Sequence, residues 1–251
     1  VGGMEAARLC RLRGFDVALY EASDHLGGSF RAAAAPDFKE DDRKLLAWYD
    51  KQLKELDIPV HMNTKVDEDL VRAEKADVVI VTTGALKKRI PIPGFDRETV
   101  CDAKEYLLEN RKIGDDIVVV GGGLTGCEVA NAIAELGKKV SIVEMQDDIL
   151  QVPDLCLVNS NMLRDMLKFN NVDVFCSAAL KEIGEDCVTI SYQGETKLIK
   201  ADNVIMAAGY NPDPVKIDIP GVEVYQAGDC VSVGNLLTAV WGVSDIVLNQ
   251  L

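Results

Sequence analysis

Short runs of consecutive apolar residues alternate along the chain with longer segments in which apolar residues recur every three or four positions. Uninterrupted apolar runs are typical of strands buried on both faces of a parallel sheet, and the longer spacing is typical of helices that pack on such a sheet. The predicted strands are 58–61, 77–83, 117–120, 140–144, 203–207 and 222–227, and the predicted helices are 41–56, 103–111, 155–169 and a last one from about 236. The pattern therefore predicts an α/β fold.

Two of the predicted helices carry an apolar stripe, and one region carries shorter strands. The stripe of the first helix is Leu45, Leu46, Trp48, Tyr49, Leu53 and Leu56, which we expect to be core, and that of the 155–169 helix is Leu155, Val158, Met162, Met166 and Phe169. Three short strands are expected over 172–176, 187–192 and 196–199, with a hairpin turn at Gly194.

An internal repeat becomes visible when the sequence is shifted by 123 residues. Gly3 then aligns with Gly126, Gly14 with Gly137, and Glu21 with Glu144. The second copy reads as strand 117–120, a GxGxxG turn, a helix, a strand and a terminal acid. The first copy keeps only the end of this pattern, so we expect its first strand and first glycine to precede the chain.

The GxGxxG turn of the second copy predicts a dinucleotide site, because each glycine has a physical task there. Gly121 permits the tight turn, Gly123 lets the backbone approach a pyrophosphate, and Gly126 brings the helix close to the strand. The helix start, with Leu124 and Thr125, then offers free N–H groups and a positive dipole end to the phosphates.

Glu144 ends the strand that follows the glycine turn. A carboxylate at this place accepts hydrogen bonds from both ribose hydroxyls and repels a 2′-phosphate. The second copy is therefore expected to bind NAD(H) rather than NADP(H). In the first copy, Gly3 stands for the third glycine and Glu21 for the ribose acid.

The composition excludes several other classes of protein. The 251 residues carry 27 Lys and Arg against 41 Asp and Glu, a net charge of −14, which repels a phosphate backbone, so no nucleic-acid partner is expected. No apolar run reaches the ~18 residues that a membrane span needs. Two histidines are too few for a His-based metal site. We therefore expect a cytoplasmic protein that needs neither a membrane nor a metal.

Seven cysteines occur, none of them in a CxxC pair, so reduced thiols are expected rather than disulfides or a redox pair. Cys127 begins the helix after the third glycine, where a lowered thiol pKa is conceivable, but packing on the sheet is the favoured interpretation. Packing is also favoured for Cys230. For Trp241 a core position is at least as well supported as a place near a flavin.

The paired glycine units, the strand ends Thr83-Gly84 and Ala208-Gly209, and the late Gly228-Asp229 together resemble the two-dinucleotide-binding-domain flavoprotein reductases. This resemblance implies two Rossmann-like domains, the NAD domain being inserted in the FAD domain. It implies an FAD-binding domain over 1–96 and 213–251, truncated at its N-terminus, and an NAD(H)-binding domain over 97–212. Gly228-Asp229 would contact FAD.

A narrower resemblance rests on Glu21, Leu26-Gly27-Gly28, Lys39-Glu40, Trp48-Tyr49, and Gly228-Asp229-Cys230 followed by Thr238-Ala239-Val240-Trp241. These residues resemble the C-terminal half of 2-enoate reductases and 2,4-dienoyl-CoA reductases, although Ser29 departs from a glutamine found in several of them. The resemblance implies an N-terminal TIM barrel in the same polypeptide, which holds FMN, an iron–sulfur cluster and the substrate. This chain would be the electron-input module.

The residues expected to contact FAD or NAD(H) are Gly2, Gly3, Glu21, Gly27, Gly28, Thr83, Gly84, Gly121, Gly123, Leu124, Thr125, Gly126, Glu144, Gly209, Gly228 and Asp229. No catalytic side chain is expected, because the two cofactors carry hydride transfer themselves. Two alternatives remain open at this point. One is a module that binds an adenine nucleotide such as ADP without catalysis, and the other is a stand-alone NADH oxidase or ferredoxin reductase.

Overall fold

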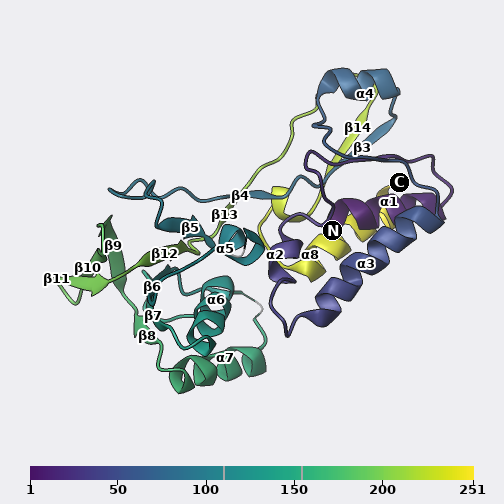
Figure 1. Ribbon diagram of the computed structural model, residues 1–251. Coiled ribbons are helices and arrows are strands. Elements are labelled where there is room, and N and C mark those ends of the chain that lie inside the picture. Colours follow the sequence, from purple (N-terminus) through teal and green to yellow (C-terminus); the bar gives the residue numbers. More distant parts are fainter. Residues whose placement is uncertain (110, 154) are drawn as a thin grey trace. The chain divides into compact units, whose positions relative to one another are not determined.

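The computed structural model describes residues 1–109, 111–153 and 155–251 (Figure 1). It divides into two compact units, one formed by Val1–Leu86 with Tyr210–Leu251 and the other by Lys87–Gly209. The domain limits expected from the sequence were 96/97 and 212/213. Both units contain parallel strands and helices, so the predicted α/β fold is confirmed.

The second unit is built on a five-stranded parallel sheet. Its order is β5 (Val100–Asp102), β12 (Asn203–Met206), β6 (Asp116–Val120), β7 (Lys139–Val143) and β8 (Asp173–Phe175). Residues 117–120 of the central strand β6 are all buried. This burial on both faces explains why the strand is an unbroken apolar run.

Two different layers cover the faces of this sheet (Figure 1). On one face Ile117 and Val119 pack with residues of α5 (Ala103–Glu109), α6 (Leu124–Glu135) and α7 (Leu157–Phe169). On the other face Val118 and Val120 pack with an antiparallel sheet. The strands of that sheet are β9 (Ala178–Ile183), β10 (Cys187–Tyr192) and β11 (Glu195–Lys200). Because side chains alternate along a strand, β6 supplies both cores.

The antiparallel sheet confirms the hairpin at Gly194. Tyr192 pairs with Glu195, and the two residues between them, Gln193 and Gly194, have φ of 52° and 81°. Two successive positive φ values are the signature of a type I′ turn, whose twist matches that of the strands. The sequence also predicted β8 and β11 near their observed places, but it missed β9.

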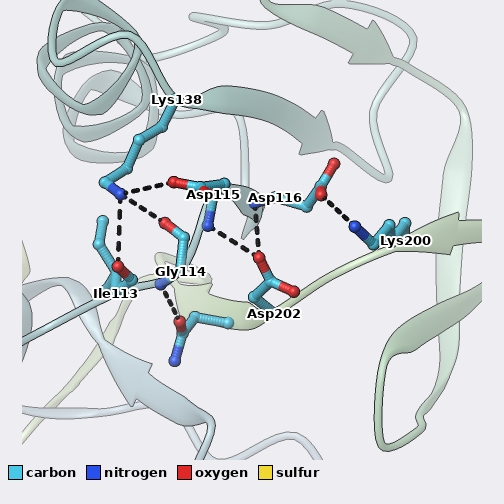
Figure 2. A network of polar contacts seen from close by, with 8 residues as sticks. Ile113, Gly114, Asp115, Asp116, Lys138, Lys200 and Asp202 are labelled. Atoms are coloured by element: carbon cyan, nitrogen blue, oxygen red, sulfur yellow. Dashed lines mark hydrogen bonds and ion pairs between the residues drawn. The ribbon is translucent and has the colours of Figure 1, made fainter.

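The amino ends of the central strands are tied together by a polar network (Figure 2). One oxygen of Asp202 accepts hydrogen bonds from the backbone N–H groups of Asp115 and Asp116, at 2.8 and 2.9 Å. The Lys200 ammonium pairs with Asp116 at 2.7 Å, and Lys138 donates to Asp115 at 3.2 Å. The two bonds to Asp202 satisfy backbone N–H groups at the amino end of the central strand β6.

The first unit has two short parallel strand pairs. One consists of β1 (Leu19–Tyr20) and β2 (Val60–His61), and the other of β3 (Val78–Val81) and β14 (Glu223–Gln226). Helix α1 (Gly2–Leu12) packs against both α3 (Glu40–Glu55) and α8 (Leu236–Asp245) (Figure 1). The shorter elements are α2 (Phe30–Ala33), α4 (Glu68–Glu74), the 3-10 helix η1 (Gly228–Cys230), the π-helix η2 (Ile246–Gln250), and the pair β4 (Ala85–Lys87) and β13 (Tyr210–Pro212).

The expectation that the whole stripe of α3 is core was wrong for Trp48. Tyr49 and Leu53 are buried, but Trp48 is 41% exposed. The guanidinium of Arg8 lies 5.3 Å from the centre of the Trp48 ring. A cation over an aromatic face is favourable and replaces part of the burial that the sequence pattern predicted. The core interpretation was also wrong for Trp241, which is 66% exposed.

The apolar stripe expected on the 155–169 helix is not the buried face of α7. Leu163 and Leu167 are buried, whereas Val158 and Phe169 are 72% and 84% exposed. The contact between α7 and α6 is therefore made by a second apolar row, Leu163 and Leu167, and not by the stripe expected from the sequence. Among the described residues, no helix is both long enough and apolar enough to cross a membrane.

Candidate dinucleotide sites

The glycine turn of the second unit lies between β6 and α6. Gly121 has φ of 112°, and a Cβ there would lie 2.4 Å from the carbonyl oxygen of Ala207. A Cβ on Gly126 would lie 1.9 Å from the carbonyl oxygen of Gly121. Only glycine fits either place, so the turn and the helix approach as closely as two backbones can. A Cβ on Gly123 would meet nothing within 4 Å, which leaves one side of the turn open.

Helix α6 begins directly on this turn. Gly123 is its N-cap residue, and the first turn, with Leu124, Thr125 and Gly126, contains no acidic side chain. The first backbone N–H groups of a helix have no partner within it, and they carry the positive end of the helix dipole. Since no acid in that turn neutralises this end, the arrangement suits a phosphate group.

Glu144 directly follows β7 and reaches the glycine turn. Its Oε2 accepts a hydrogen bond from the backbone N–H of Gly122, and its Oε1 accepts one from the N–H of Gln146 at 2.7 Å. The carboxylate is therefore fixed beside the turn in the place where a ribose acid is required. Both groups that the motif needs, an open turn and a carboxylate, come together in this unit.

Gly122 is a further residue of this candidate site, and its spacing in the motif did not single it out. A Cβ there would lie 2.7 Å from Ile149 and 3.1 Å from the Cβ of Glu144. The close approach of the acid thus depends on a glycine at a position where the motif permits any residue. The run of three consecutive glycines was the available signal.

The first unit places its counterpart residues around the start of α1. Gly2 and Gly3 open this helix, and a Cβ on Gly3 would lie 2.9 Å from the Oγ1 of Thr82. Glu21 directly follows β1, and its Oε1 accepts hydrogen bonds from the N–H and the hydroxyl of Ser23, at 2.8 and 2.7 Å. The repeat seen in the sequence is therefore also a structural repeat of helix start and acid.

Asp229 lies close to the same helix start. The carboxylates of Glu21 and Asp229 both lie within electrostatic range of the backbone nitrogen of Val1, which precedes α1. The Oδ1 of Asp229 also accepts a hydrogen bond from the N–H of Gly234 at 3.1 Å. The structure thus brings Gly2, Glu21 and Asp229 into one neighbourhood, although they lie far apart in the sequence.

The other expected contacts lie in turns that follow strands. Thr83 donates its hydroxyl to the carbonyl of Asp213 at 2.6 Å, and Gly84 accepts from the N–H of Asp213 at 3.1 Å. Gly209 follows β12, and Gly228 opens η1 after β14. In a further turn, a Cβ on Gly27 would meet Leu46, whereas one on Gly28 would meet nothing within 4 Å. Contact of these residues with a cofactor stays a prediction.

The cysteines near the two turns are structural. Cys127 is fully buried, its thiol lies 3.3 Å from the carbonyl oxygen of Gly122, and burial raises its pKa to about 12. Cys230 is buried and its thiol lies 3.3 Å from the carbonyl oxygen of Val81. A neutral buried thiol is a poor nucleophile, so Cys127 does not suit redox exchange. Over the described residues no cluster of His, Cys, Asp or Glu could hold a metal ion.

Comparison with known proteins gives one family and several longer relatives. The family described as pyridine nucleotide-disulphide oxidoreductase matches residues 1–246. The chain is 37% identical to a cinnamate reductase of Clostridium sporogenes over 99% of its length, and 28% identical to an NADH oxidase of Thermoanaerobacter brockii over 95%. A solved structure of 2-naphthoyl-CoA reductase, in complex with 2-naphthoyl-CoA, superposes with a TM-score of 0.89 at 30% identity over 99% of this chain.

All three relatives are much longer than this chain. It spans 38% of the length of the cinnamate reductase, of the NADH oxidase and of the 2-naphthoyl-CoA reductase. The match therefore identifies one module of such proteins.

Proposed function

Since this chain belongs to the pyridine nucleotide-disulphide oxidoreductase family, whose members are FAD- and NAD(P)(H)-binding proteins, we propose that it is the electron-input module of an NADH-dependent flavoprotein reductase. Hydride passes from NADH to FAD in this module. The observation that carries the proposal is the joint placement of an open glycine turn, an unneutralised helix start and the Glu144 carboxylate in the second unit.

NADH binding follows from what these groups offer. The open side at Gly123 and the N–H groups at the start of α6 receive the pyrophosphate, and Glu144 receives the hydroxyls of the adenosine ribose. A 2′-phosphate would bring negative charge against Glu144. The preferred cofactor is therefore NADH over NADPH.

FAD binding is assigned to the first unit. Gly2 and Gly3 at the start of α1 offer a helix start beside the carboxylates of Glu21 and Asp229. Unlike α6, α1 carries an acid in its first turn, Glu5, whose charge is paired with Arg8. When bound, the flavin supplies the hydride acceptor, so the protein needs no acid or base of its own for this step. The chain's residues bind and orient the two cofactors.

The repeat also relates the strands of the two units. In the second unit β6 lies between β12 and β7, whose counterparts by sequence are β3 and β1. In the first unit β3 pairs with β14, and β1 pairs with β2. The order of the second sheet therefore leaves room for one more parallel strand between β3 and β1.

A reduced flavin in this unit would supply electrons to a second redox centre outside this chain. The names of two relatives, cinnamate reductase and 2-naphthoyl-CoA reductase, support an unsaturated carboxylate or acyl thioester as the final acceptor. We propose that FMN and an iron–sulfur cluster on an N-terminal TIM barrel of the same polypeptide carry the electrons there. Because this chain spans only 38% of the length of those two relatives, their length supports a further domain such as this barrel.

The NADH oxidase among the relatives favours a second candidate, an oxidase that passes the electrons to dioxygen. A module that binds ADP without receiving hydride is the third. The three candidates differ in whether NADH reduces a bound flavin and in whether dioxygen rapidly reoxidises the reduced flavin.

The test is a visible absorption spectrum of the chain loaded with FAD, recorded before and after anaerobic addition of NADH, with NADPH as the matched control. The proposal expects a bound flavin band that bleaches with NADH and much more slowly with NADPH. A bound flavin that stays oxidised while ADP still binds would support the nucleotide-binding module. Rapid reoxidation of the bleached flavin by air would support the oxidase. If no flavin is retained, the measurement is repeated on a chain extended at its N-terminus.

A further inference from the structure

Arg164 lies on α7, outside the glycine turn and outside the motif, yet it holds the loop that follows Glu144. Its Nη1 donates to the Oδ1 of Asp148 at 2.8 Å, and its Nη2 donates to the Oδ2 at 2.9 Å. The same Nη2 donates to the carbonyl oxygen of Ile149 at 2.6 Å. One guanidinium thus fixes a side chain and a backbone carbonyl at successive positions of the loop.

The two residues after Asp148 connect this loop to the glycine turn. The N–H of Leu150 donates to the carbonyl oxygen of Gly122 at 2.7 Å, and the side chain of Ile149 occupies the space beside Gly122. Leu150 has φ of 58°, a left-handed conformation that is unfavourable for a bulky residue. Such a conformation persists where the surroundings hold it, and the contacts of Arg164 and Gly122 lie on either side of it.

The other side of Gly122 faces the acid, because its N–H donates to Glu144. Gly122 is therefore held through its carbonyl by Leu150 and through its N–H by Glu144. A change in the position of the 148–150 segment would therefore move the peptide that hydrogen-bonds Glu144. Ile149 and Leu150 anchor this segment by burial in the core of the unit, and Arg164 adds a polar clamp from α7.

We propose that Arg164 is a positioning residue for cofactor discrimination. By clamping Asp148 and Ile149 it holds Gly122 and Glu144 in the arrangement that accepts an unphosphorylated ribose. This inference rests on the proposed function of the second unit as the NADH site. It assigns a specificity role to a residue that touches neither the pyrophosphate turn nor the ribose acid directly.

The test measures binding of ADP-ribose and of 2′-phospho-ADP-ribose by calorimetry, because these probes report on the ribose site without any flavin chemistry. For Arg164→Gln we expect about fivefold weaker binding of ADP-ribose, the upper end for a partly exposed ion pair. The preference for ADP-ribose over its 2′-phosphate should fall by a similar factor. Arg164→Lys, which keeps the charge but loses the two-pronged contact, should lie between wild type and Arg164→Gln.

Lys200→Gln is the control, since it removes the ion pair with Asp116 at the amino end of β6, the end opposite the glycine turn. It should leave both affinities and their ratio unchanged. Amide exchange at Leu150 should accelerate in Arg164→Gln and not in Lys200→Gln, which gives a local readout even if affinity is hard to measure.

Three results would overturn the inference. Wild-type affinities and ratio in Arg164→Gln would show that the clamp does not set the site. An equal loss in Lys200→Gln would show that the effect is general destabilisation. If the wild-type chain binds neither probe, the proposed function itself fails and the inference fails with it, an outcome that the wild-type measurement alone reveals.

Discussion

The two copies of the repeat hold their strand-end carboxylates, Glu21 and Glu144, in partly different ways. In both, one carboxylate oxygen accepts a hydrogen bond from the backbone N–H two residues further on, which is Ser23 for Glu21 and Gln146 for Glu144. Glu21 accepts a further one from the Ser23 hydroxyl, and Glu144 accepts a further one from the N–H of Gly122, a position whose counterpart by the 123-residue offset precedes Val1. The shared bond shows that the strand end alone can orient an acid. The bond to Gly122 couples the acid of the second copy to the turn that we propose as the pyrophosphate site.

The helices that follow the two turns also differ at equivalent positions. Arg8 of α1 forms an ion pair with the buried Glu5 at 2.8 Å. The residue at the same place in α6 is Asn131, which is buried and hydrogen-bonded to Glu135 and Asn170, both at 2.9 Å. The repeat therefore preserves the helix start and leaves each helix to satisfy its own buried polar groups.

The largest expected effect is a loss of NADH binding by the second copy with little loss of its stability. Gly123→Val should weaken NADH binding by ~100-fold, or about 2.7 kcal/mol, because the new side chain fills the open side of the turn. Gly123 has φ of −71° and no neighbour within 4 Å of a Cβ, so its replacement should cost about 1 kcal/mol of stability or less. Calorimetric titration with NADH and urea unfolding measure the two quantities. Unchanged NADH affinity would contradict the assignment of the turn.

The third glycines of the two copies should respond differently to alanine. Gly126→Ala places a Cβ against the carbonyl of Gly121 and should destabilise the second unit by about 3 kcal/mol. In Gly3→Ala the nearest atoms belong to the side chains of Thr82 and Leu19, and the gain in helix propensity offsets much of the strain. Hydrogen exchange in α6 and α1 distinguishes the two units. Equal destabilisation by both changes would contradict this comparison.

Charge reversal at Glu144 and at Glu21 should affect the binding of different cofactors. Glu144→Arg should shift the preference from NADH towards NADPH by about tenfold, since a guanidinium attracts the 2′-phosphate that the carboxylate repels. Glu21→Arg should leave that preference unchanged and weaken FAD retention instead. Initial rates with each nicotinamide cofactor, together with the flavin content after gel filtration, give both readouts. A change of nicotinamide preference in Glu21→Arg would refute the assignment of FAD to the first unit.

The smallest effect concerns the polar network at the amino end of the second sheet. Backbone N–H groups of Asp115 and Asp116 lower the pKa of Asp202 below its ordinary value of 3.8. The stabilisation is therefore present above pH 3.8 and is lost as the pH falls through the lower folded-state value. Asp202→Asn should flatten this acid dependence, which urea unfolding between pH 2 and pH 5 measures as a small change in slope. An unchanged pH profile would show that the network contributes nothing to acid stability.

The sequence predicted the parts of these sites that depend on local backbone. The glycines at 121 and 126 are dictated by contacts within one strand–turn–helix unit, so their spacing alone predicts their roles. The role of Gly122 depends on Ile149 and Glu144, and that of Arg164 on Asp148, contacts which the spacing does not encode. Trp48 was misjudged for the same reason, because its periodicity predicts burial while Arg8 on another helix provides a different partner.

The pairing of β3 with β14 has a consequence for the order of events during synthesis. Val78 pairs with Glu223, so the first unit cannot complete this pair until the whole second unit has left the ribosome. The second unit begins and ends at neighbouring residues, since the N–H of Lys88 donates to the carbonyl of Gly209 at 3.0 Å. Once the second unit has folded, its two ends lie side by side, and the flexible chain between β3 and β14 becomes much shorter. The chain entropy lost when β3 pairs with β14 is then smaller. The folded second unit thus lowers the entropic cost of pairing the two segments of the first unit that flank it.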